Sequence, residues 1–78
     1  MPTLRLFASA REAAGRARDD VPGATVEAVL AEAVQRYGEG FAAVLAGCKV
    51  WVNGEPATPE QPVRDGDEVA VLPPVSGG

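Results

Sequence analysis

Hydrophobic and polar residues alternate in three separate stretches of the chain. The stretches run from Thr3 to Phe7, from Cys48 to Val52 and from Glu68 to Leu72. A period of two residues is typical of a strand with one buried face, so we expect three strands here. Lys49 and Trp51 fall on the polar side of the second stretch. The residues predicted to face the core are Leu4, Leu6, Val50, Val52, Val69 and Val71.

The most regular segment begins at Thr25, whose hydroxyl is suited to cap a helix. Apolar residues then recur at the spacing of one continuous helical face until Gly38, a residue type that commonly ends helices. Glu27 lies in the first turn, where a carboxylate interacts favourably with the helix dipole. The predicted apolar face consists of Val26, Val29, Leu30, Ala33, Val34 and Tyr37.

Two shorter helical turns are also expected. Ser9 and Glu12 have the spacing of a capping box, and Gly15 follows at the position where a turn of that length would end. The second turn covers Phe41 to Leu45, before Gly47, and its apolar side chains would cover one end of the core.

The connecting segments carry turn signals and a further strand. Arg16 to Val21 is polar and is predicted to form an edge strand beside the first strand, ahead of the turn at Pro22-Gly23. Asn53-Gly54 predicts a tight hairpin turn, and Asp65-Gly66 predicts a turn into the last strand. The stretch between these two turns is expected to be irregular because of Pro56, Pro59 and Pro62.

This order of elements predicts an α+β fold, in which one main helix packs on one face of a mixed sheet of four or five strands. A chain of 78 residues is long enough for a single small core. We therefore interpret residues 1–78 as one domain, with residues 73–78 as a projecting tail.

The charge and the composition argue against several classes of function. The formal net charge is −4 and the basic residues form no run, which argues against nucleic-acid binding. An acidic surface fits a partner with a basic docking groove, or it serves solubility alone. No apolar run approaches membrane-spanning length and no signal stretch is evident. The single Cys48 fits a reducing compartment, so we expect a cytoplasmic protein.

Catalytic and metal-binding patterns are weak. The chain has no histidine, which excludes histidine-based triads and histidine metal sites. Cys48 has only Lys49 as a nearby cation and is interpreted as a structural thiol. The acidic residues between Asp65 and Glu68 are better explained by a turn than by a metal loop. Gly38 to Gly40 follows a helix and carries no lysine, unlike a phosphate-binding loop.

The carboxylate of Gly78 is the most plausible reactive group. Gly77 and Gly78 carry no Cβ and could pass through a channel too narrow for side chains, while Pro73 and Pro74 would end the preceding strand. A carboxylate reacts with nucleophiles only after activation, commonly by adenylation, for which a partner would have to supply ATP. The alternative is a chain end without function.

Four segments of the sequence resemble the small subunits of molybdopterin synthase, a family of ubiquitin-like sulfur carriers. The most specific is the tail, in which two prolines are followed by Val75, a small residue and Gly-Gly. The implied fold is the ubiquitin-like β-grasp, in agreement with the predicted element order. The four segments are Leu6-Phe7-Ala8 leading to Arg11-Glu12 and Gly15, then Gly23 to Val26, Val52 to Glu55, and Asp65 to Val69 running into Leu72 to Gly78.

The resemblance implies that an E1-like adenylyltransferase adenylates the Gly78 carboxylate with ATP. A sulfur donor protein would then replace AMP and leave a thiocarboxylate. The tail would enter the large subunit of the synthase and donate sulfur to cyclic pyranopterin monophosphate in molybdenum cofactor biosynthesis. The small subunit would bind no cofactor or metal, would not be an enzyme on its own, and would form a heterotetramer with a dimer of large subunits.

The resemblance also implies roles for individual residues. Gly77 would leave clearance beside the reacting carbonyl of Gly78. The implied partner-binding residues are Phe7, Arg11, Leu72, Pro73, Pro74, Val75 and Ser76.

Three alternatives remain open from the sequence. The chain could carry sulfur for thiamine or cysteine biosynthesis, it could be a ubiquitin-like modifier joined to a partner lysine, or it could be a binding module with an inert tail. Trp51 and Phe7, on the polar sides of their strands, are either partner anchors or ordinary surface aromatics.

Overall fold

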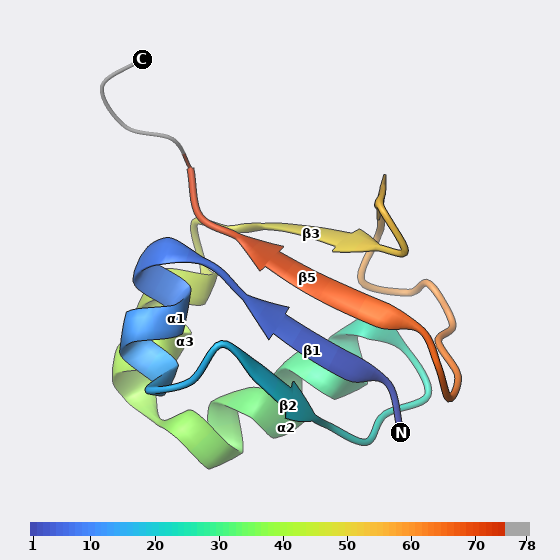
Figure 1. The fold of residues 1–78 in the computed structure, drawn as a ribbon, viewed down its shortest axis with the longest axis horizontal. Coiled ribbons are helices and arrows are strands. Elements are labelled where there is room, and N and C mark those ends of the chain that lie inside the picture. Colours follow the sequence, from blue (N-terminus) through green and yellow to red (C-terminus); the bar gives the residue numbers. More distant parts are fainter. Residues whose placement is uncertain (75–78) are drawn as a thin grey trace.

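Within residues 1–74, the part of the chain that the computed structural model describes, five strands form one mixed sheet and three helices cover one face of it (Figure 1). The elements are β1 (Thr3–Leu6), α1 (Ala8–Ala14), β2 (Arg18–Asp20), α2 (Val26–Tyr37), α3 (Glu39–Leu45), β3 (Lys49–Val52), β4 (Glu55–Pro56) and β5 (Glu68–Leu72).

The first and last strands lie side by side in the middle of the sheet. The strand order is β2-β1-β5-β3-β4, with β1 and β5 parallel and all other neighbours antiparallel. The α+β class and the predicted number of strands are confirmed. The polar segment after Gly15 does form the edge strand β2, and β4 is the short outer strand of the hairpin.

The long helix agrees closely with the sequence prediction. The hydroxyl of Thr25 accepts a hydrogen bond from the Ala28 N–H at 3.2 Å, and Gly38 ends α2 with a φ of 93°. The positive φ explains why glycine stands at this end, because other residues rarely adopt it. Val26, Val29 and Ala33 are buried against the sheet.

The predicted capping box at Ser9 is wrong. The helix α1 already includes Ala8, and Phe7 stands at its N-cap without a side-chain hydrogen bond. The cause is the direct passage from β1 into α1: Ala8 turns the chain with a φ of 49°, and the carbonyl of Phe7 accepts the first hydrogen bond of the helix, from Ala10 at 3.0 Å. The strand therefore ends at Leu6, one residue earlier than predicted. Gly15 does end the helix, with a φ of 77°.

A single main helix was an incomplete prediction. Both short turns are helices of seven residues, and α3 buries Phe41 completely, as the apolar stretch before Gly47 indicated. The core lies between the inner face of the sheet and the three helices. Its largest fully buried side chains are Phe41, Leu4, Val21, Val26, Val29, Val69 and Val71.

The two predicted turns are joined by Asn53. This residue and Gly54 form the two-residue turn between β3 and β4, with positive φ angles of 50° and 84°. The Asn53 amide donates to the Asp67 carboxylate at 3.0 Å, and its carbonyl accepts from the Glu68 N–H at 2.9 Å. The hairpin is thereby held against the start of β5.

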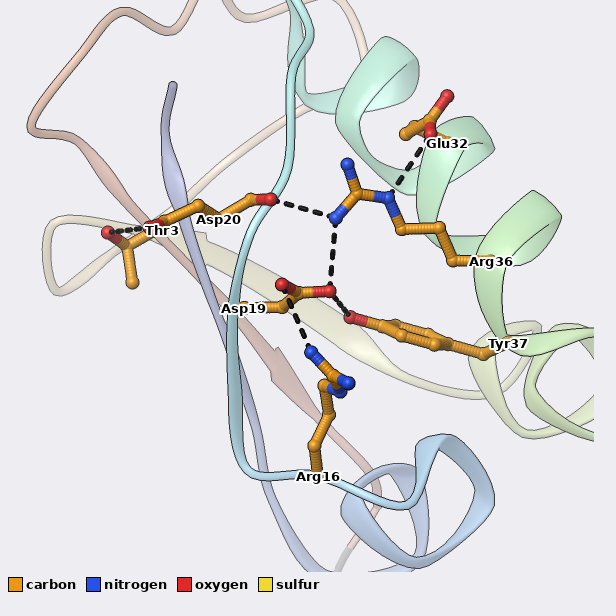
Figure 2. Close-up of polar contacts among 7 residues, drawn as sticks. All are labelled: Thr3, Arg16, Asp19, Asp20, Glu32, Arg36 and Tyr37. Atoms are coloured by element: carbon orange, nitrogen blue, oxygen red, sulfur yellow. Dashed lines mark hydrogen bonds and ion pairs between the residues drawn. The ribbon is translucent and has the colours of Figure 1, made fainter.

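A polar cluster fastens the edge strand β2 to the end of α2 (Figure 2). The Asp19 carboxylate accepts hydrogen bonds from the Tyr37 hydroxyl at 2.6 Å and from Arg36 at 3.1 Å, and it pairs with Arg16 at 3.3 Å. The hydrogen bond from Tyr37 is the main cause of the lowered pKa of Asp19. The pKa of Tyr37 is raised to about 12, mainly by burial of the side chain and secondly by its hydrogen bond to Asp19. Arg36 also donates to the Asp20 carbonyl at 2.8 Å.

Candidate functional site

The face of the sheet opposite the helices, here called the open face, has no helix over it in residues 1–74 (Figure 1). Side chains alternate along each strand, so burial of the inner-face residues places the intervening residues on the open face. Trp51 therefore faces outward, as predicted, beside its cross-strand partner Ala70. The strand residues of the open face are Thr3, Arg5, Arg18, Asp20, Lys49, Trp51, Glu68, Ala70 and Leu72.

The chain leaves the sheet at one end of this face, where β5 finishes. Leu72 is half-buried and pairs with Lys49 of β3. Phe7 comes directly after Leu6, the partner of Val71, so it reaches the same end of the sheet. After β5 the chain turns away from the body, with Pro73 half-buried and Pro74 exposed (Figure 1).

Several of the predicted partner-binding residues are thus brought to one end of the molecule. Phe7, Leu72, Pro73 and Pro74 gather around the point where β5 ends, although Phe7 and Leu72 are 65 positions apart (72 − 7) in the sequence. Arg11 is exposed on α1, which lies at this same end (Figure 1). Val75, Ser76, Gly77 and Gly78 lie outside the described residues, so their assigned roles stay predictions.

Arg5 is a residue of this face that the sequence reasoning missed. Its guanidinium carbon lies 5.2 Å from the centre of the Phe7 ring, and its Nη1 lies 3.6 Å from a carboxylate oxygen of Glu68. A guanidinium over an aromatic face is attractive, so Arg5 holds the Phe7 ring against the open face. The alternation of β1 carried the signal, since Arg5 and Phe7 are two residues apart.

Cys48 lies on the other side of the sheet, in a groove of about 410 Å³ between α2 and β3. Its thiol donates to the Val44 carbonyl at 3.2 Å, and burial raises the pKa of the thiol. A raised pKa keeps the sulfur protonated and weakly nucleophilic, which supports its interpretation as a structural thiol.

Two further features are absent from residues 1–74. No three residues with metal-ligating side chains are grouped closely enough there to hold an ion. None of the helices in that range is long and apolar enough to cross a membrane.

A comparison of sequences assigns the chain to a family. The model of the ThiS family matches residues 4–78. The chain belongs to the ThiS family. This ThiS-family chain is 35% identical over 77 residues to a protein of Chlamydomonas reinhardtii named molybdopterin synthase sulfur carrier subunit, with 92% of both chains covered. It is 38% identical over 83 residues to a protein of the same name from Pyrenophora tritici-repentis, covering 97% of this chain and 88% of that one.

Solved structures confirm the ubiquitin-like β-grasp fold of this ThiS-family chain. The small archaeal modifier protein SAMP1 from Haloferax volcanii superimposes with a TM-score of 0.77 at 34% identity, over 97% of both chains. The Amycolatopsis orientalis BexX/CysO complex contains a chain that superimposes with a TM-score of 0.81 at 26% identity, over 100% of both chains.

Proposed function

We propose that this ThiS-family chain is the sulfur carrier subunit of a molybdopterin synthase. The observation that carries the proposal is the match of the ThiS family model as far as Gly78, together with relatives of that name along nearly the whole chain. The fold supports it, because β5 finishes at one end of an uncovered sheet face and the chain leaves the sheet there after Leu72.

The chemistry takes place at the carboxylate of Gly78. An E1-like partner that holds ATP transfers AMP to this carboxylate and releases pyrophosphate. The acyl carbon then becomes susceptible to attack, because AMP is a better leaving group than oxide. A sulfide-level sulfur supplied by a donor protein attacks the acyl carbon, AMP leaves, and Gly78 ends in a thiocarboxylate. The sulfur atom alone is then passed to the acceptor in the large subunit, and hydrolysis of the acyl group restores the Gly78 carboxylate. The carrier contributes its reactive end and no catalytic group of its own.

The open face positions that tail in its partner. Phe7 and Leu72 supply apolar surface at the point where the chain leaves the sheet, and Arg5 holds the Phe7 ring in place. A protein docked on this face would lie next to the point where the chain leaves the sheet after Leu72. The large synthase subunit is the proposed partner, with cyclic pyranopterin monophosphate as the sulfur acceptor. The heterotetramer and the cytoplasmic location stay predictions.

The test is the intact mass of the chain after incubation with ATP, an E1-like activating enzyme and a sulfur donor. We expect a gain equal to sulfur minus oxygen, which is lost when Gly78 is deleted or extended by one residue. The variants should keep the circular dichroism spectrum of the wild type, because the strands and helices that the structure describes all lie within residues 3–72. Sulfur loading of a chain with a blocked terminus would refute the proposal.

A second candidate function is protein modification, favoured by the likeness to the small archaeal modifier protein. In that case the activated carboxylate would end in an isopeptide bond with a lysine of another protein. The assay is mass spectrometry of trypsin-digested cell extracts for lysines that carry residues 65–78, the remnant left by cleavage after Arg64, the last basic residue of the chain. Lys49 is the only lysine of the chain, so a Lys49→Arg variant removes conjugation of the chain to its own side chains as a source of such adducts.

A further inference from the structure

Charges on the open face are separated by sign along the strands. Asp20, Thr3 and Glu68 stand in one row across β2, β1 and β5, at the end of the sheet where β5 begins. One step of two residues further along, the register places Arg18 beside Arg5. Two residues in a strand span about 6.6 Å, so the sign of the charge reverses within a short distance.

The cationic end is the end from which the tail leaves. Lys49 lies on β3 and pairs with Leu72, the last residue of β5. Arg18 lies on the same face, across β5 and β1, on the edge strand β2. Between these two cations lie apolar side chains that are half-buried in the free chain, and Arg5 stands next to them. The apolar members are Phe7, Trp51, Ala70 and Leu72.

Arg18 and Lys49 are available to a partner. Both are exposed, and neither takes part in an ion pair within residues 1–74. Arg5, in contrast, already pairs with Glu68, and Arg36 is used by the cluster around Asp19. Two unpaired cations beside an apolar strip stand out on a chain with a net charge of −4.

We propose that the open face docks on a partner protein whose surface carries acidic side chains around an apolar centre, next to the opening that receives the tail. This inference rests on the proposed function, which supplies the partner. Complementary charges accelerate encounter and fix orientation, and Arg18 and Lys49 flank the strip so that both would be satisfied in one register only. The net acidic charge of the whole chain predicts a partner with a basic docking groove. At the docking end of the open face, however, the exposed charged side chains are cations, so the matching surface of the partner is acidic.

The experiment measures binding of the full chain to the large subunit of molybdopterin synthase from the same source, by stopped-flow or biolayer interferometry at low and high salt. The variants are Arg18→Glu, Lys49→Glu and their combination. Arg64→Glu is the matched control, because it makes the same change of charge in the turn before β5, at the opposite end of the sheet. Melting temperatures of all variants establish that the fold is retained.

We expect each test variant to slow association at low salt roughly tenfold, and the control to change it less than about twofold. The difference should shrink at high salt, because exposed charges are screened. Test variants that behave like Arg64→Glu, or a slowing that persists unchanged at high salt, would overturn the inference while leaving the carrier function intact. A wild-type chain that does not bind the large subunit at all would overturn the proposed function and the inference together.

Discussion

Replacement of Gly23 by alanine provides a strict test of the packing in this fold. Gly23 precedes the helix α2, and its backbone lies against the first turns of that helix. A Cβ on Gly23 would lie 2.6 Å from the Val29 backbone nitrogen, 2.7 Å from a Val29 methyl carbon and 2.9 Å from the Ala28 carbonyl carbon. Non-bonded carbon atoms prefer separations of about 3.5–4.0 Å, so all three contacts are too close.

The size of the effect follows from what would have to move. Two of the three atoms belong to the helix backbone, so relief requires a shift of α2 or of the segment that carries Gly23. Overpacking commonly costs about 1–3 kcal/mol, and we expect the upper end here because backbone is involved. For a domain of this size, about 3 kcal/mol corresponds to a melting temperature lower by roughly 12–24 °C.

Gly40→Ala is the matched control, because the same side chain is added to a glycine with no atom within 4 Å of the new Cβ. Gly40 lies inside α3, where alanine is favoured over glycine by about 0.5–1 kcal/mol, so this variant should be slightly more stable than the wild type. Thermal and urea unfolding would be followed by circular dichroism and by the fluorescence of Trp51, the single tryptophan. If Gly23→Ala melted at the temperature of Gly40→Ala, the close approach inferred for this segment would be wrong.

Four further predictions concern Tyr37, Asp19 and Cys48. Tyr37→Phe removes the hydroxyl that donates to Asp19 and should lower the free energy of unfolding at neutral pH by about 1–2 kcal/mol, measured by urea titration. The pKa of Asp19 is lower in the folded than in the unfolded chain. Its contribution to the free energy of unfolding is therefore present above the unfolded pKa and is lost as pH falls through the folded pKa. Asp19→Asn should flatten this dependence of stability on acid pH. Tyr37 is the single tyrosine, and its phenolate absorbance in the folded chain should appear near pH 12, above that of the unfolded chain. The free energy of unfolding should therefore fall as pH rises from the unfolded to the folded pKa of Tyr37. An absorbance midpoint equal to that of free tyrosine would contradict the burial of Tyr37. Cys48→Ser should retain sulfur loading, and a loss of loading with an unchanged fold would assign the thiol a chemical role.

Most of the secondary structure could be predicted because its causes are local. The helical period after Thr25, the glycines at Gly15 and Gly38, and the Asn53-Gly54 turn each depend on residues within a few positions of one another. The capping box at Ser9 failed for a reason that is not local to the motif. The strand β1 continues into α1 without a loop, so the helix begins before the serine that could have capped it.

The candidate site likewise has one part that local sequence predicts and one part that depends on the fold. The double proline and Gly-Gly indicate a reactive tail from the sequence alone, since their effect on the backbone needs no partner in the fold. The surface around the tail could not be obtained in this way. Arg18, Arg5 and Lys49 form one cationic end only because β1 pairs with β2 on one side and β5 pairs with β3 on the other.

The sequence by itself therefore determined most of the elements, the α+β class and, through the tail, the family to which the chain belongs. Only the tertiary structure decided which strands are neighbours, that Phe7 and Leu72 share one end of the sheet, how closely Gly23 approaches α2 and how the charges separate on the open face. The physical reason is the range of the interactions. Propensity and hydrophobic period act over a few residues, whereas register and close packing join segments such as β1 and β5, which only the folded chain brings together.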